Sequence, residues 1–303
     1  MNILVIRLGA MGDILHTLPA VEMLYRQNPE ARIYWIAEDR WHPLLVGHPA
    51  LAGLLPFNRR SWNGLRATRR ALRALEFDQA IDFQGLIKSA LVAWQSGAAR
   101  RLGATVTREG PAGWFYSEKV ATPAAHIVEQ HAQLVAREFE LRPVWLPAGQ
   151  AEGGLPEGPF VLASPFAGWV SKQWPLEHYA ELARMLPLPL VLNVAPEQAV
   201  KVADMGCVHV SSVAGLIDAT RRARAVVGVD SGPLHLAAAL GKPGVALFGG
   251  TDPARNGPYG VSLQVLRHPR AVTSYERGDT LDPLMRDLKP AQVYAALAPY
   301  LVS

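Results

Sequence analysis

Short apolar runs alternate with longer helix-forming runs along both halves of this chain, and this alternation restricts its fold more than any other feature. In the first half we expect strands at residues 3–7, 32–37, 53–57, 79–83 and 100–103, and helices at 14–27, 63–75, 86–95 and 127–140. In the second half we expect strands at 160–163, 188–193, 207–210, 225–229 and 244–248, and helices at 176–185, 197–205, 213–222 and 234–240. Alternating strands and helices build a parallel sheet with helices on both faces. The pattern therefore predicts an α/β fold with two doubly wound domains.

A stretch rich in proline and glycine separates the two halves. It contains Pro143, Pro147, Gly149, Gly153, Gly154, Pro156 and Gly158. These residue types interrupt regular structure and are common in linkers. We therefore expect one domain over residues 1–150, a linker at about 142–158 and a second domain over residues 159–289. Doubly wound domains bind ligands at the carboxyl ends of their strands, so we expect these ends to face a central cleft.

The net charge of +4 lies entirely in the first half. Residues 1–150 contain 17 Lys and Arg against 13 Asp and Glu, whereas residues 151–303 contain 13 of each. Six arginines occur with no acidic residue among them, namely Arg59, Arg60, Arg66, Arg69, Arg70 and Arg73. Such a run is either a solvated face or a contact for an anionic partner, such as a phosphorylated lipid or an anionic membrane surface. No nucleic-acid-binding motif accompanies it, so we expect no nucleic acid partner.

Cysteine content and the N-terminus indicate the compartment. The single cysteine, Cys207, cannot form an intramolecular disulfide, which fits a reducing environment. The first apolar run is too short for a signal peptide. No window of about 20 residues is apolar enough to span a bilayer. We therefore expect a cytoplasmic protein.

The segment from Val229 to Leu236 reads VDSGPLHL, and it lies between an apolar run and a helix-forming run. This order predicts a buried strand, a tight turn and a helix N-terminus. A helix N-terminus presents unpaired N–H groups and a partial positive charge, so it can bind an anion. The turn from Asp230 to His235 is thus either an ordinary strand-to-helix connection or a holder for a phosphorylated ligand.

Two further loops carry charged residues after predicted strands. Asp13 begins a helix and is either a helix cap or a carboxylate able to take a proton from a substrate hydroxyl. Lys172 is either a solvated lysine or a cation for a diphosphate. The chain has no Asp-x-Asp pair and no His/Cys metal spacing, so we expect no metal and no cofactor. Lys172 and helix N-termini would then neutralise a bound diphosphate.

Several segments, in order along nearly the whole chain, resemble glycosyltransferase family 9, and within it the type I heptosyltransferases. The segments are MGDILHTLPA (11–20), AIDFQGLIKSA (80–90), REGP (108–111), KQWP (172–175), DSGPLH (230–235), GGTDP (249–253) and GPYG (257–260). The resemblance implies a GT-B fold, in which two Rossmann-like domains face a central cleft. The first would bind the acceptor and the second the nucleotide sugar. The final helix, within residues 290–303 here, would join the first domain.

The resemblance also implies the reaction and its partners. It implies inverting, metal-independent transfer of heptose from ADP-L-glycero-D-manno-heptose to Kdo of the lipid A inner core, a step of lipopolysaccharide core biosynthesis. The partners would be the ADP-sugar donor, the anionic lipid A/Kdo acceptor and, peripherally, the cytoplasmic face of the inner membrane.

The matching positions assign roles to individual residues. Asp13 would be the general base. Donor binding would involve Lys172, Glu197, Asp230, Ser231, Gly232, Pro233, Leu234 and His235. Acceptor binding would involve Arg59, Arg60, Lys88 and Arg108.

One departure from the type I pattern leaves alternatives open. Type I enzymes commonly carry hydroxyl residues before the lysine, where this chain has Ala167 and Gly168. The alternatives are another family 9 enzyme with a different nucleotide sugar or acceptor, such as a type II heptosyltransferase, a two-domain nucleotide-sugar epimerase, and a non-catalytic binding protein.

Overall fold

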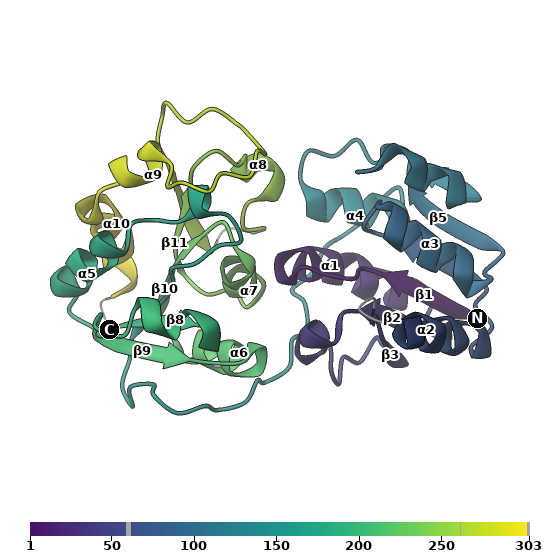
Figure 1. Ribbon diagram of the computed structural model, residues 1–303, viewed down its shortest axis with the longest axis horizontal. Helices are drawn as coiled ribbons and strands as arrows, with labels where there is room; N and C mark the ends of the chain where they lie inside the picture. Colours follow the sequence, from purple (N-terminus) through teal and green to yellow (C-terminus); the bar gives the residue numbers. More distant parts are fainter. Residues whose placement is uncertain (59–61, 261, 302–303) are drawn as a thin grey trace. The chain divides into compact units, whose positions relative to one another are not determined.

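The chain divides into two compact units, Met1–Pro147 and Ala148–Ser303 (Figure 1). The computed structural model describes residues 1–58, 62–260 and 262–301. Each unit contains one six-stranded sheet in which all neighbouring strands are parallel. The predicted fold class, two doubly wound α/β domains, is confirmed.

The first unit has the strand order β3-β2-β1-β4-β5-β6. Its elements are β1 (Asn2–Ile6), α1 (Met11–Gln27), β2 (Arg32–Ala37), η1 (Asp39–Leu44), β3 (Gly53–Pro56), α2 (Trp62–Ala74), β4 (Gln79–Asp82), α3 (Ile87–Ser96), β5 (Arg100–Ala104), η2 (Gly110–Phe115), β6 (Glu118–Val120) and α4 (Ile127–Val135). With the right-handed crossovers typical of parallel strands, this order places α2, α3 and η2 on one face of the sheet and α1 on the other. Helix α4 packs against α1.

Strand β1 shows why these residues form a central strand. It lies between β2 and β4, with Val5 opposite Trp35 and Ile81. The side chains from Ile3 to Ile6 are fully buried. Because helices cover both faces of the sheet, both faces of the strand must be apolar, and the sequence reads as one unbroken apolar run.

The second unit has the strand order β12-β11-β10-β7-β8-β9. Its elements are β7 (Val161–Ser164), η3 (Val170–Lys172), α5 (Leu176–Met185), β8 (Leu190–Val194), η4 (Pro196–Lys201), β9 (Cys207–Val210), α6 (Val213–Arg222), β10 (Ala225–Val229), α7 (Gly232–Ala239), β11 (Gly244–Phe248), α8 (Pro253–Asn256), β12 (Leu263–Arg267), α9 (Pro283–Asp287), α10 (Pro290–Leu297) and η5 (Ala298–Tyr300). Its core is built around the fully buried Trp174 and Tyr179.

The final helix lies in the second unit in this structure, whereas the family resemblance implied that it would join the first domain. Helix α10 packs against α5 and β11. Its residues Val293, Ala296 and Leu297 belong to the apolar core of the second unit. Burial of this apolar face accounts for the position of the helix.

Some elements differ from the predicted ones. Strands β6 and β12, each at one edge of its sheet, were not predicted, because polar residues interrupt their apolar character (EKV and LQVLR). The helix expected at 197–205 is the short 3-10 helix η4, whose residue Val200 is 82% exposed. Without an apolar stripe to bury, this segment gains little from forming an α-helix. Helix α4 ends at Val135, earlier than expected.

The strand order of the two sheets bears on function. The direction of strand addition reverses between β1 and β4 in the first sheet and between β7 and β10 in the second. Loops leave such a point toward opposite faces, which opens a ligand-binding crevice at the carboxyl ends of the strands. Within the described residues, no helix combines the length and apolar character that a membrane span requires.

A substitution in β5 tests the packing of the first unit. A Cβ on Gly103 would lie 2.1–2.5 Å from the ring of Tyr116, whose hydroxyl donates to Asp82 at 2.7 Å. We expect Gly103→Ala to lower the free energy of unfolding by about 1–3 kcal/mol, because the ring must be displaced. Urea denaturation measures the change. Gly110→Ala, where the added carbon meets nothing within 4 Å, is the matched control, and equal stability of the two variants would contradict this packing.

Candidate functional site

In the second unit, the point where strand order reverses brings Lys172 and Asp230 together. Lys172 ends η3, in the connection after β7, and Asp230 directly follows β10. Their side chains form an ion pair, with 2.5 Å between Lys172 Nζ and Asp230 Oδ2. The other carboxylate oxygen of Asp230 lies 3.5 Å from His235 Nε2. Three of the predicted donor-binding residues therefore form one cluster.

The Asp230 carboxylate is largely buried, with 7% of its side chain exposed. Burial alone would raise the pKa of Asp230. The hydrogen bond with His235 and the charge of Lys172 outweigh burial and hold the pKa well below its ordinary value. Asp230 is therefore ionised at neutral pH, and it fixes the Lys172 ammonium beside the start of α7.

Helix α7 begins immediately after this cluster. Ser231 is its N-cap residue but makes no side-chain cap bond, and its buried Oγ has no hydrogen-bond partner among the described residues. The following residues, Gly232, Pro233 and Leu234, form the first turn. Its N–H groups and partial positive charge suit an anionic group.

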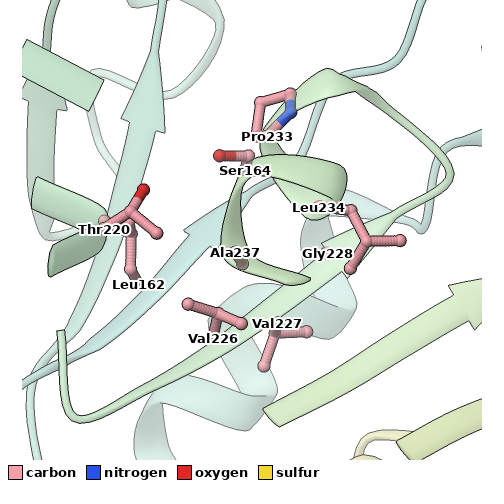
Figure 2. Close-up of a pocket in the computed structure, with 9 residues that line it drawn as sticks. All are labelled: Leu162, Ser164, Thr220, Val226, Val227, Gly228, Pro233, Leu234 and Ala237. Carbon is pink, nitrogen blue, oxygen red and sulfur yellow. The ribbon is translucent and has the colours of Figure 1, made fainter. Parts of the chain in front are cut away.

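The close approach of α7 to the sheet fixes the position of this turn. Leu234 and Ala237 lie over β10, and they enclose a cavity of only about 10 Å³ with Val226, Val227 and Gly228 (Figure 2). A Cβ on Gly228 would come within 3.0 Å of Leu234 Cδ1. Glycine in β10 therefore allows the helix to sit directly on the strand.

A pocket of about 310 Å³ adjoins Lys172 in the same unit. The residues that line it include Trp169, Ser171, Thr251, Arg277 and Asp282. Lys172 Nζ lies 4.3 Å from the centre of the Trp169 ring, and the Arg277 guanidinium lies 5.9 Å from it. The buried Oγ1 of Thr251 has no partner within the described part of the chain. The pocket thus offers two cations, an aromatic face and an available hydroxyl beside the acidic residues Glu276 and Asp282, and the first three suit a phosphorylated aromatic ligand.

Glu197 lies apart from this cluster. It is exposed and belongs to η4, which follows β8. Because β8 is the neighbour of β7 in the sheet, Glu197 lies at the same carboxyl edge as Lys172, one strand further from Asp230. The structure places it within this edge but gives it no contact with the other predicted donor-binding residues.

In the first unit, Asp13 forms the centre of a second cluster. It lies in the first turn of α1, and its Oδ2 accepts a hydrogen bond from the Ala10 N–H at 3.2 Å. Its Oδ1 is paired with the buried Arg7 guanidinium, and it lies 3.4 Å from Arg108 Nη2. Burial would raise the pKa of Asp13, but the charges of Arg7 and Arg108 hold it below its ordinary value. The Asp13 carboxylate is therefore ionised at neutral pH. Its side chain is 26% exposed, so a ligand can reach it.

The remaining predicted acceptor residues are placed less closely. Lys88 is partly buried in the first turn of α3, where the helix dipole disfavours a cation but favours an anionic ligand. The loop before α3 contacts the segment that carries Arg108, since a Cβ on Gly85 would lie 3.3 Å from the backbone nitrogen of Arg108. Arg59 and Arg60 lie outside the described residues.

Sequence reasoning missed Arg7, Trp169 and Thr251 as members of these clusters. Arg7 carried a signal, because a charged residue that ends a buried apolar strand usually has a partner. Thr251 belongs to the GGTDP segment that supports the family resemblance. Among the residues that the structure describes, no group of three His, Cys, Asp or Glu side chains is arranged to hold a metal ion.

Comparisons with known proteins identify the family to which this chain belongs. The model of glycosyltransferase family 9 (heptosyltransferase) matches residues 65–284. The chain is 32% identical over 297 residues to lipopolysaccharide heptosyltransferase 1 of Pseudomonas aeruginosa, covering 86% of this chain and 82% of that protein. It is 30% identical over 307 residues to lipopolysaccharide heptosyltransferase 1 of Escherichia coli K12, covering 89% and 94%.

Solved structures extend the likeness to both units. The E. coli heptosyltransferase WaaC with ADP has a TM-score of 0.80 and 27% identity, covering 99% of this chain and 100% of that one. E. coli ADP-heptose lps heptosyltransferase II has a TM-score of 0.82 and 24% identity, covering 99% and 98%. The predicted GT-B fold and the resemblance to family 9 are confirmed.

The Arg7–Asp13 pair can be tested without any knowledge of the reaction. In Arg7→Met, burial of Asp13 is opposed by Arg108, the Ala10 N–H and His131 but no longer by Arg7, so we expect the pKa of Asp13 to rise. The free energy of unfolding at neutral pH should fall by up to about 3 kcal/mol, because the carboxylate loses its buried partner. NMR titration of the Asp13 carboxyl carbon and urea denaturation measure the two effects.

The lowered pKa of Asp13 also determines how the free energy of unfolding changes with pH. Because the folded pKa of Asp13 is below its ordinary value, its contribution is present above about pH 4 and is lost as pH falls. In Arg7→Met, the free energy of unfolding should therefore fall less as the pH is lowered. The control is Arg137→Met, which changes an exposed arginine. An Asp13 titration identical to that of the unmodified protein would contradict the pairing.

Proposed function

Since this chain belongs to glycosyltransferase family 9, we propose that it transfers heptose from ADP-L-glycero-D-manno-heptose to Kdo of the lipid A inner core, with inversion at the anomeric carbon. The observation that carries the proposal is the identity of 30–32% to heptosyltransferase 1 enzymes over more than four fifths of both chains. Identity to lipopolysaccharide heptosyltransferase 2 of E. coli K12 is lower, at 25%. A UDP-GlcNAc 2-epimerase from Methanocaldococcus jannaschii shares only the fold, at 12% identity and a TM-score of 0.51.

The donor would bind in the second unit. A lysine ammonium has three N–H donors, so Lys172 can keep its bond to Asp230 and still bind a diphosphate oxygen. The α7 turn, from Ser231 to His235, would add backbone N–H groups as charge develops on the leaving ADP. Glu197 would accept hydrogen bonds from the ribose hydroxyls. The WaaC structure contains ADP, which supports a nucleotide donor. That the reaction needs no metal stays a prediction.

The acceptor would be activated in the first unit. The acceptor hydroxyl attacks the anomeric carbon from the side opposite ADP, and Asp13 accepts its proton. A carboxylate with a lowered pKa is a weak base toward an ordinary alcohol, so we expect proton transfer late, as the C–O bond forms and the hydroxyl becomes acidic. Arg108 and Lys88, with Arg59 and Arg60, would bind the acidic groups of the acceptor.

The acceptor also implies a location. Lipid A is a membrane lipid, so we propose that the protein works at the cytoplasmic face of the inner membrane, in peripheral contact with it. The excess of basic residues in the first half of the chain supports an anionic acceptor.

The test of the whole proposal is transfer from a panel of nucleotide sugars to heptose-free, Kdo-terminated lipid A. We expect turnover with ADP-heptose and an inverted anomeric configuration in the product. Turnover with another nucleotide sugar in its place would overturn the donor assignment.

Asp13→Asn tests the base. The amide has nearly the same shape but cannot accept the proton, so we expect kcat to fall by roughly 10²–10⁴-fold. The affinity for ADP should stay unchanged, because the proposed donor site is in the other unit. Calorimetry with ADP is the control for folding. Substantial residual turnover would remove Asp13 from this role.

Lys172→Met tests the donor site. We expect the Kd for ADP to rise by about 10–100-fold, since a charge-assisted bond contributes about 1.5–3 kcal/mol. Part of this loss would come from the Asp230 charge left beside the phosphates. The double variant Lys172→Met/Asp230→Asn removes that charge and should recover part of the affinity. Unchanged ADP binding in Lys172→Met would exclude the lysine from the diphosphate site.

A further inference from the structure

Helix α2 presents a row of arginines to solvent. Arg66, Arg69, Arg70 and Arg73 follow the spacing i, i+3, i+4 and i+7, so they share one face of the helix. All four are exposed, whereas Leu72 is fully buried against the sheet. No carboxylate of the described residues forms an ion pair with any of them. The row is therefore a concentrated, uncompensated positive charge.

The elements beside α2 expose large apolar side chains. Helix α3 packs against α2, and η2 packs against α3. On α3, Ile87 and Trp94 are two turns apart on one face and are 37% and 55% exposed. On η2, Trp114 is 81% exposed. Trp94 and Trp114 are the two most exposed tryptophans that the structure describes.

The arginine row of α2 adjoins the carboxyl end of α3. A Cβ on Gly97, the residue directly after α3, would lie 2.5 Å from an Arg73 guanidinium nitrogen. Arg73 therefore reaches the end of α3, one turn from Trp94. We call the set Arg66, Arg69, Arg70, Arg73, Ile87, Trp94 and Trp114 the α2–α3 surface.

This combination fits one kind of partner. Exposed tryptophan is favourable at the headgroup level of a bilayer, where its ring is buried and its N–H stays hydrated. Clustered arginines are attracted to anionic headgroups. We propose that the α2–α3 surface docks this protein on an anionic phospholipid bilayer, with Trp94 and Trp114 inserted among the headgroups.

The inference rests on the proposed function only for its purpose, namely access to a lipid-borne acceptor. Lys88, a proposed acceptor residue, follows Ile87 directly in α3. Docking through this surface would hold that end of α3 next to the bilayer, so an acceptor could be reached with its acyl chains still in the membrane. Bilayer binding itself requires neither donor nor transfer.

The experiment is co-flotation of the full chain with vesicles of phosphatidylcholine containing about a third phosphatidylglycerol, compared with pure phosphatidylcholine. We expect the unmodified protein to bind the anionic vesicles. Arg69→Glu/Arg70→Glu should weaken binding by about tenfold or more, because each basic residue near an anionic surface contributes measurably. Arg137→Glu/Arg184→Glu makes the same change in net charge at exposed positions outside this surface and should bind as the unmodified protein does.

Tryptophan fluorescence provides a second readout. Brominated lipids quench tryptophans that enter the bilayer, so vesicles of these lipids should quench part of the emission of the unmodified protein. Trp94→Phe/Trp114→Phe should bind the vesicles but lose this quenching. If Arg69→Glu/Arg70→Glu and Arg137→Glu/Arg184→Glu lose binding equally, binding depends on net charge alone and the proposal is overturned. Quenching that persists in Trp94→Phe/Trp114→Phe would also overturn it.

Transfer assays separate this inference from the proposed function. With a water-soluble Kdo acceptor that lacks acyl chains, the arginine and tryptophan variants should retain the turnover of the unmodified protein. If the unmodified protein transfers no heptose but still binds anionic vesicles through these residues, the proposed function fails and the docking surface stands.

Discussion

In each unit a carboxylate with limited exposure to water is kept ionised by a neighbouring cation, and both candidate clusters depend on this pairing. Asp13 is held by Arg7, and Asp230 is held by Lys172. A shielded carboxylate without such a partner would take up a proton or destabilise the fold. The cation must therefore stay beside the carboxylate, and a rigid element has to hold it there. Strand β1 leads directly into Arg7, and the connection after β7 carries Lys172 beside the start of α7.

The architecture was largely predictable because parallel strands covered on both faces leave a simple record in the sequence. Runs such as ILVI in β1 and AVVGV in β10 are apolar throughout, and each is followed by a helix. Strands β6 and β12 leave no such record, because each lies at one edge of its sheet, where polar residues are tolerated, and polar residues interrupt both (EKV and LQVLR). The packing of α10 on α5 was also not predictable, since it depends on the shape of a surface formed by distant segments.

The candidate site was predictable as positions but not as contacts. Asp13, Lys172 and Asp230 could be placed because each follows a strand, and parallel strands end at a common edge. That Lys172 lies 2.5 Å from Asp230 follows from β7 and β10 being neighbours, and this strand order is not written in either segment. The Arg7–Asp13 pair depends on side-chain direction at the end of β1. The roles of Arg59 and Arg60 remain predictions.

The burial of the Lys172–Asp230 pair has a consequence for how ionic strength acts on this protein. Dissolved ions screen charges over about 8 Å at physiological salt and about 3 Å at 1 M. Lys172 Nζ and Asp230 Oδ2 are 2.5 Å apart, and the Lys172 and Asp230 side chains are only 19% and 7% exposed. Mobile ions therefore cannot enter between the two groups. The arginine row of α2 is open to solvent. Concentrated salt should therefore act on the two kinds of charge selectively, releasing the protein from lipid while its internal ion pair stays intact.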